Sequence, residues 1–125
     1  MTNKFEPREF IEDVIKQNAS ELPKYFTPDA IIRWHDSNEQ FTVAEYIKAN
    51  CEYPGDWTYV IDRIEKTEHG LVTAITIASG DISFKVVSFL IVNRNKITHL
   101  DEYFVTIEEV PQWRKNMNLG THIQS

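Results

Sequence analysis

Apolar residues recur at helical spacing near the beginning of the chain. They predict a helix from about Pro7 to Asn18, whose apolar face is formed by Phe10, Ile11, Val14 and Ile15. Pro7 suits the first turn of a helix, where its missing N–H would have no partner. A second, shorter helix is predicted from Ser20, which is a good N-cap residue, to Phe26.

The third predicted helix has the clearest local signature in the chain. Thr42 and Glu45 have the spacing of a capping box, in which each side chain bonds to the other residue's backbone N–H. Phe41 and Tyr46 occupy the two positions of a hydrophobic staple around that box. We expect Cys51, further along this helix, to be a small buried hydrophobe rather than a nucleophile.

From residue 57 onward the pattern is that of successive strands. Strands are predicted over residues 30–36, 57–66, 71–78, 82–92 and 97–108. Ser79-Gly80-Asp81 separates two apolar runs and indicates a tight hairpin. No helix is predicted after residue 53 that could connect parallel strands, so the last four strands are expected to be antiparallel.

Helices followed by strands define an α+β fold class. The predicted helices are short, so they can cover the long sheet only if that sheet curls around them. We therefore expect a cone-shaped, curved antiparallel (mixed) sheet wrapped around N-terminal helices. Its open end would hold a cavity, a usual place for a small-molecule site. Residues 109–125 are expected to form a C-terminal tail with one aromatic anchor, Trp113.

The predicted strand over residues 82–92 is apolar on both faces in its second half. Val87, Phe89 and Ile91 alternate there with Val86, Leu90 and Val92. A half-exposed antiparallel strand should alternate with polar residues instead. This pattern predicts a homodimer that covers the outer face of the sheet at Val87, Phe89 and Ile91.

Length and charge then exclude several classes of protein. The 125 residues fit a single domain, and the net charge of −6 includes no basic stripe of the kind that nucleic-acid-binding proteins use. The longest apolar run is far shorter than the roughly 20 residues that span a bilayer, so no membrane is expected as partner. The beginning of the chain has no apolar signal-peptide segment, and Cys51 is the single cysteine. These features favour a cytoplasmic location.

The order of these elements, with three short motifs, resembles the nuclear transport factor 2-like superfamily. The motifs are Tyr25-Phe26-Thr27-Pro28-Asp29-Ala30 leading into the first strand, Asn95-Lys96-Ile97, and Asp101-Glu102-Tyr103-Phe104. The SnoaL-like polyketide cyclases and the ketosteroid isomerases belong to this superfamily, and the resemblance covers about residues 7–108. It implies a cystatin-like α+β cone that is often a homodimer. The superfamily hosts both enzymes and binding modules, so the fold alone does not define a function.

Glu102 is the first candidate for chemistry. It matches the acidic residue before Tyr-Phe that acts as a general acid in epoxide hydrolases of the superfamily. A carboxyl group among aromatic side chains would have its pKa raised by desolvation, which suits proton transfer near neutral pH. The alternative is a Glu102 that is partly solvated or paired with an arginine. The predicted strand over residues 71–78 has no Arg or Asp, so epoxide hydrolysis is not expected.

Asp36 is the second candidate, because it resembles the catalytic-base aspartate that closes the first strand of the ketosteroid isomerases. The alternative is an Asp36 that only caps the following turn. The first helix has no tyrosine to form an isomerase oxyanion hole, so a steroid-type isomerase is not expected. His35 could replace Asp36 as base. Strand alternation places His35 and Trp34 on opposite faces, so only one of the two lines the cavity.

The expected ligand pocket combines aromatic side chains with a few others, namely Trp34, Trp57, Tyr46, Tyr53, Phe84, Ser88 and Leu100. We expect no metal, because the four histidines are scattered, and no cofactor, because the glycines are isolated and form no phosphate loop. The sequence predicts a pocket for a small hydrophobic molecule, with acid–base chemistry on a carbonyl compound if the protein is an enzyme. The alternative is a binding or protein-interaction module that performs no catalysis.

Overall fold

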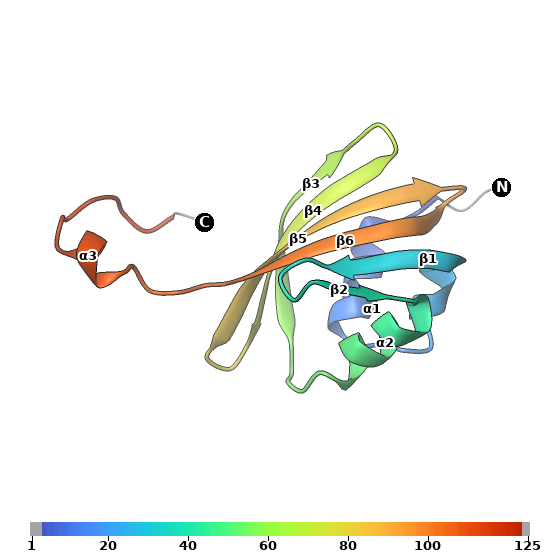
Figure 1. Cartoon of the computed structure of the whole chain (residues 1–125), viewed down its shortest axis with the longest axis horizontal. Coiled ribbons are helices and arrows are strands. Elements are labelled where there is room, and N and C mark those ends of the chain that lie inside the picture. Colours follow the sequence, from blue (N-terminus) through green and yellow to red (C-terminus); the bar gives the residue numbers. More distant parts are fainter. Residues whose placement is uncertain (1–3, 124–125) are drawn as a thin grey trace.

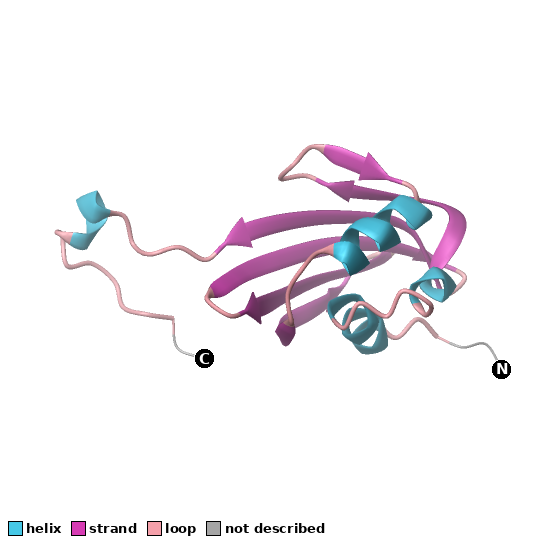
Figure 2. Ribbon diagram, turned by 90° about the horizontal axis from the view of Figure 1, so that it is seen from below, coloured by secondary structure: helices cyan, strands magenta, loops and turns pink. Residues whose placement is uncertain are grey.

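A curved sheet of six strands carries the fold, and helices cover one of its faces (Figures 1 and 2). The computed structural model describes residues 4–123. The helices are α1 (Pro7–Ile15), the 3₁₀ helix η1 (Leu22–Tyr25), α2 (Val43–Glu52) and α3 (Gln112–Lys115). The strands are β1 (Phe26–Trp34), β2 (Glu39–Phe41), β3 (Thr58–Lys66), β4 (Gly70–Ser79), β5 (Ile82–Asn93) and β6 (Lys96–Thr106). The α+β class is confirmed.

The strand order across the sheet is β2-β1-β6-β5-β4-β3. Strands β3 to β6 form the expected antiparallel meander, and β2 adds to β1 in an antiparallel pair. β1 lies parallel to β6, with Trp34 beside Glu102 and Ile32 beside Leu100. The sheet is therefore mixed, and it is not closed, since β2 and β3 are its two edges. The parallel pair is what brings the end of the first strand next to the last strand's acidic residue.

The concave face of the sheet and the helices enclose the core. One cluster of buried side chains joins η1 and α2 to β1 and β6 and includes Leu22, Ile32, Tyr46, Ile97 and Leu100. A second cluster joins α1 to the meander and includes Ile11, Ile15, Trp57, Ile75 and Val86. Because side chains alternate along a strand, the same strands present a second set of residues on the opposite face. No helix within the described residues 4–123 lies over that outer face (Figure 2).

Several local predictions need correction. The first helix ends at Ile15 rather than Asn18, because Gln17 takes a left-handed backbone conformation with φ of 57° that ends the helix. The short strand β2 is not among the strands predicted from the sequence. Trp113 does not anchor the tail, since 67% of its surface is exposed.

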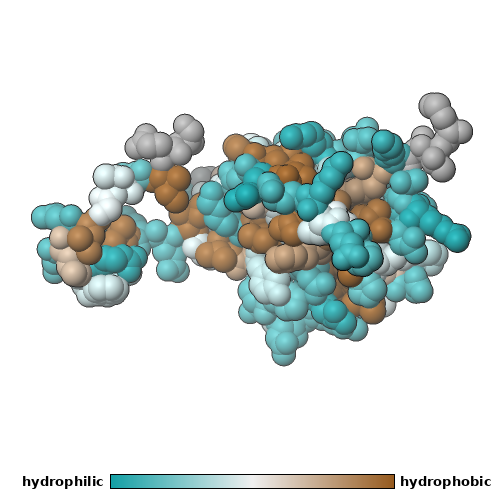
Figure 3. Space-filling view, turned by 90° about the horizontal axis from the view of Figure 1, so that it is seen from above, coloured by the Kyte–Doolittle hydropathy of each residue, from teal (hydrophilic) through white to brown (hydrophobic). Residues whose placement is uncertain are grey.

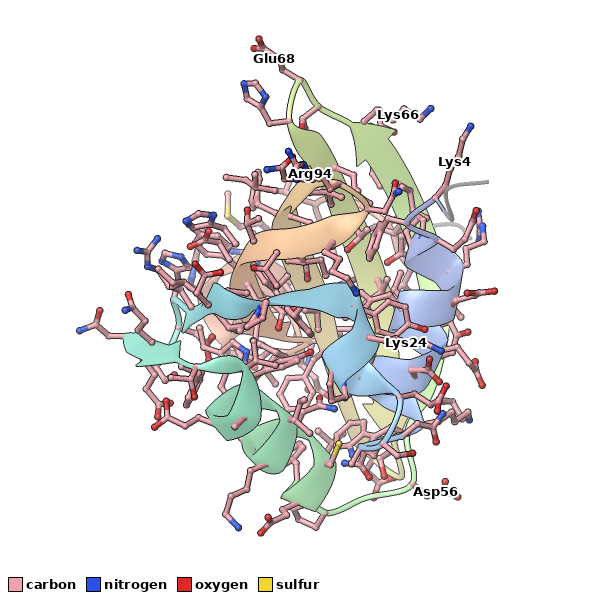
Figure 4. The ribbon with its side chains drawn as sticks, turned by 90° about the vertical axis from the view of Figure 1, so that its right-hand side faces the viewer. Lys4, Lys24, Asp56, Lys66, Glu68 and Arg94 are labelled. Carbon is pink, nitrogen blue, oxygen red and sulfur yellow. The ribbon has the colours of Figure 1, made fainter. Side chains whose placement is uncertain are left out.

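The turns at the two ends of the molecule carry charged side chains (Figure 4). Glu68 lies in the turn between β3 and β4, and Asp56 lies at the opposite end, in the loop between α2 and β3. Within residues 4–123, no helix is long and apolar enough to cross a membrane.

Candidate functional site

A cavity of about 250 Å³ opens between the helices and one end of the sheet. Five of its lining side chains are aromatic: Trp34, Tyr53, Trp57, Phe84 and Phe104. Aliphatic lining comes from Val14, Ile15, Ala49 and Ile77, and polar lining comes from Gln17, Asp36 and Asn50. Small-molecule sites commonly have this composition, in which many apolar groups surround a few polar ones.

The aromatic side chains hold one another in fixed orientations. Tyr53 stacks on Trp57 with ring centroids 5.4 Å apart, and Trp57 contacts Phe84 at 6.0 Å. The indole N–H of Trp57 donates to the carbonyl of Pro54 at 3.2 Å, so this buried donor is satisfied. On the sheet side, Trp34 meets Phe104 edge to face at 5.6 Å. These contacts leave apolar ring surface, rather than polar edges, for a ligand.

Two amide side chains fasten α1 to α2 at the cavity. Gln17 Nε2 donates to the carbonyls of Asn50 and Tyr53, both at 2.8 Å. Asn50 Nδ2 donates in return to the carbonyl of Val14 at 3.0 Å. The donors of both amides are thus used structurally.

Glu102 is buried on the inner face, 7% exposed, and both its carboxylate oxygens accept hydrogen bonds. Trp34 Nε1 donates to Oε1 at 3.1 Å, and Ser88 Oγ donates to Oε2 at 2.6 Å. Burial raises the pKa of Glu102; the bonds from Ser88 and Trp34 lower it in part, and the nearby charge of Asp36 raises it. Glu102 is not one of the residues that line the cavity, whereas its partner Trp34 is.

Tyr46 lies close to this buried carboxyl group. Its side chain is 1% exposed, and its hydroxyl is the one buried side-chain polar atom within the described residues that lacks a hydrogen-bond partner. Burial raises the pKa of Tyr46 well above its ordinary value, and the charge of Glu102 adds to the effect. Burial therefore shifts both groups toward their protonated forms relative to the same groups in water. An unpaired buried hydroxyl is unusual and marks the interior beside Glu102 as a place with spare hydrogen-bonding capacity.

His35 lies on the outer face of the sheet, away from the cavity. Its Nε2 is 2.7 Å from Asp101 Oδ1, and its ring stacks on Tyr103 at 4.4 Å with an interplanar angle of 8°. Of the two alternatives for this strand, Trp34 is the residue that faces inward. The role of His35 as a substitute base in the cavity is therefore wrong.

The structure brings together Trp34, Asp36, Tyr53, Trp57 and Phe84 from the expected site. It places Tyr46, Ser88 and Leu100 in the buried interior, outside the cavity lining, so their assignment to the pocket wall needs correction. Gln17, Asn50 and Phe104 also line the cavity and are not among the residues expected from the sequence. Phe104 could have been found, because it lies two residues after Glu102 and so shares its face of the strand. No sequence pattern marks Gln17 and Asn50 as pocket residues, because their positions depend on how α1 packs against α2.

Comparisons with known proteins support the fold but define nothing finer. No known family profile matches the sequence, and no curated protein matches it. Among solved structures, a candidate ketosteroid isomerase from Kribbella flavida is 21% identical, with a TM-score of 0.78 over 95% of this chain and 87% of that one. A nuclear transport factor 2-like protein of unknown function from Burkholderia xenovorans is 19% identical, with a TM-score of 0.72 over 92% and 94%.

A candidate SnoaL-like polyketide cyclase from Shewanella putrefaciens is 9% identical, with a TM-score of 0.66 over 78% of this chain and 75% of that one. These similarities show that the chain has the nuclear transport factor 2-like fold. The expected resemblance is confirmed. Because all three identities are low, they establish the fold and leave activity to be argued from the site.

Proposed function

We propose that this protein binds a small, mostly apolar organic molecule in the cavity between α1, α2 and the end of the sheet. The observation that carries the proposal is the aromatic wall of Trp34, Trp57, Phe84 and Phe104 around a hollow of about 250 Å³. Asp36 is the one acidic side chain among the lining residues that the structure describes, so a ligand with one hydrogen-bond donor near its edge fits best.

The volume restricts the size of the ligand. Pockets for drug-sized molecules measure roughly 300–1,000 Å³, and this cavity of about 250 Å³ lies just below that range. A molecule of one or two fused rings fits this space better than a four-ring steroid. The flat ring surfaces of Trp34 and Trp57 favour an aromatic or conjugated ligand.

A matched pair of substitutions on α2 tests this binding. Ala49 lines the cavity, whereas Ala44 on the same helix is exposed. Neutral 2-naphthol serves as the probe, and its affinity is measured by isothermal titration calorimetry or ligand-observed NMR. Ala49→Phe should weaken binding at least tenfold, because the new ring fills the hollow, and Ala44→Phe should leave it unchanged. Equal binding by wild type and Ala49→Phe would contradict the proposal.

Proton transfer is the second candidate function, and the placement of Asp36 favours it. Asp36 lies on the cavity wall, and its charge acts on the buried Glu102. A carboxylate there can remove a proton from the carbon beside a carbonyl group, and the C–H electron pair then moves into an enolate. Return of the proton from Asp36 to a different carbon would complete an isomerisation. Glu102 would act as a positioning residue that holds Trp34, since Trp34 is the partner that lines the cavity.

A β,γ-unsaturated cyclic ketone tests this second function, because its conversion to the conjugated isomer is visible by ultraviolet absorbance. Wild-type protein should accelerate the conversion over buffer, and Asp36→Asn should abolish the acceleration. The variant should still bind 2-naphthol, because the amide oxygen of the new side chain can accept from the hydroxyl group and the aromatic wall is unchanged. If wild-type protein binds 2-naphthol but does not accelerate the conversion, the proton-transfer function is contradicted and only the binding function remains.

We further propose a homodimer that covers the outer face of the sheet around Val87, Phe89 and Ile91. Phe89 is 47% exposed and Ile91 43%, on the face that none of the described helices covers. Contiguous apolar surface of this kind usually marks an interface. Sedimentation at micromolar concentration should show a dimer for wild type and a monomer for Phe89→Glu. Ile82→Glu, a control at the β4–β5 hairpin, should remain dimeric.

A further inference from the structure

The chain ends in an apolar arm, which we define as residues 110–123. Every described residue from Val105 to Ile123 is exposed. Five large apolar side chains lie on the arm, with exposed fractions from 47% to 95%: Val110, Trp113, Met117, Leu119 and Ile123. Solvated tails are normally poor in such residues, so apolar surface repeated along one segment indicates a binding surface.

The arm extends away from the domain that carries it (Figures 1 and 2). It continues beyond β6, past the end of the sheet, and includes the short helix α3. Several of its contacts are local: Gln112 Nε2 donates to Asn116 Oδ1 at 3.0 Å, and the Arg114 guanidinium lies over the Trp113 ring at 5.1 Å. The apolar side chains of the arm are therefore presented to another molecule.

Charge separates the arm from the rest of the chain. Beyond Glu109 the charged residues are Arg114 and Lys115, and there is no acidic side chain. The residues up to Glu109 contain 11 Lys or Arg and 19 Asp or Glu, a net charge of −8. A basic, apolar arm is complementary to the acidic body of this same chain. Because the arm points away from its own body, the complementary body is that of a second copy.

The arm also continues the apolar outer face of the sheet. Tyr103 and Val105 lie on that face, and Ile107 follows at the same alternate spacing with 48% of its surface exposed. Ile107 N donates to the carbonyl of Ser83 at 3.0 Å, so the chain still runs along β5 there. Figure 3 shows apolar surface both over the sheet and on the projecting arm. One molecule that covers the outer face would thus meet the arm as well.

We infer that in the homodimer each C-terminal arm lies across the body of the partner copy. The 14 residues of the arm reach up to about 45 Å when extended, at roughly 3.3 Å per residue. A domain of about 100 residues has a radius of gyration of about 13 Å, so the arm is long enough to cross its face. This inference rests on the proposed dimer, and it adds that the arms exchange and strengthen the association.

Paramagnetic relaxation in a mixed dimer tests the exchange directly. One copy carries the Cys51→Ser and Met117→Cys substitutions, with a nitroxide attached at position 117. It is mixed with a second copy that carries Cys51→Ser alone, is labelled with ¹⁵N and has no nitroxide. Signals of body residues in the ¹⁵N copy should broaden, because the arm of one molecule lies on the other. The inference is overturned if the signals of the ¹⁵N copy do not broaden. It is also overturned if they broaden only when nitroxide and ¹⁵N are in the same chain, because the arm would then fold back onto its own body.

Sedimentation equilibrium supplies an independent measurement. Trp113→Ser combined with Leu119→Ser should weaken dimerisation at least tenfold, whereas the control Gln112→Ser with Thr121→Ser should not. A wild-type protein that is monomeric at all concentrations would contradict both the proposed dimer and the arm exchange. A stable dimer whose affinity is unchanged by the Trp113 and Leu119 substitutions would contradict the arm exchange but not the dimer.

Discussion

The indole N–H of Trp34 donates to the Glu102 carboxylate at 3.1 Å, across the parallel pair of β1 and β6. The two residues lie directly beside each other in the register of that pair. Trp34 thus forms part of the cavity wall, while its N–H donates to the buried carboxyl group of Glu102. The shape of the cavity and the protonation of Glu102 are therefore coupled through one side chain.

The first prediction concerns pH and Glu102→Gln. Burial raises the pKa of Glu102 above its ordinary value, so the folded state favours the protonated acid. The stability that this preference supplies is complete below the pKa of the unfolded chain and is lost as pH rises through the folded pKa. A glutamine has no such dependence, and its amide can still accept from Trp34 and donate to Ser88.

Urea unfolding of both proteins between pH 4 and pH 8 checks this prediction. Glu102→Gln should gain stability relative to wild type as pH rises, with most of the gain just above the ordinary carboxyl range. Glu108→Gln, at an exposed position, is the control for a general change in net charge. A stability difference that stays constant over the whole pH range would show that the folded protein does not shift the pKa of Glu102.

The second prediction concerns Trp34→Phe, which keeps an aromatic ring but removes the N–H donor. A buried hydrogen bond to a charged group contributes about 1.5–3 kcal/mol, so the free energy of unfolding at pH 8 should fall by at least that much. The double variant with Glu102→Leu measures the coupling, because a leucine side chain cannot accept the hydrogen bond that Trp34 and Glu102 share. Strictly additive effects of the two substitutions would mean that the bond contributes nothing to stability.

Local features of the fold could be predicted from the sequence. Thr42 and Glu45 form both bonds of the capping box, and the β4–β5 hairpin turns at Gly80, whose φ of 58° suits glycine. These features depend on residues within a few positions of one another. The alternation of side chains along β6 likewise separates Glu102 from Asp101 and Tyr103 correctly.

Features that depend on distant residues could not be predicted in the same way. Trp34 and Glu102 are 68 positions apart, and no local pattern specifies that their strands run parallel. The role of Gln17 depends on the angle at which α1 meets α2, because its amide bonds to backbone carbonyls of the other helix. The structure therefore places Trp34, Trp57 and Phe84, which lie at or next to strand ends, on the cavity wall, whereas Tyr46, Ser88 and Leu100 lie deeper.

The third prediction concerns the capping box of α2. Glu45 N donates to Thr42 Oγ1 at 3.2 Å, and Thr42 N donates to Glu45 Oε1 at 2.9 Å. Thr42→Ala removes the first of these bonds and should lower the free energy of unfolding by about 1 kcal/mol. Thr121→Ala, at an exposed position on the arm, should change it by far less. Equal unfolding midpoints for the two variants would argue against a contribution from the cap.

The last prediction concerns Gly70, where β4 begins beside β5. A Cβ atom added at Gly70 would lie 1.8 Å from the carbonyl oxygen of Leu90, a backbone atom that cannot move without distorting the β4–β5 ladder. Gly70→Ala should therefore lower the free energy of unfolding by about 3 kcal/mol or more, near the upper end for single substitutions. Gly80→Ala is the matched control: its Cβ meets nothing within 4 Å, so its cost is the left-handed backbone alone, about 1–2 kcal/mol. Urea denaturation that ranks Gly80→Ala as the more damaging variant would contradict the close approach of β4 and β5 at this position.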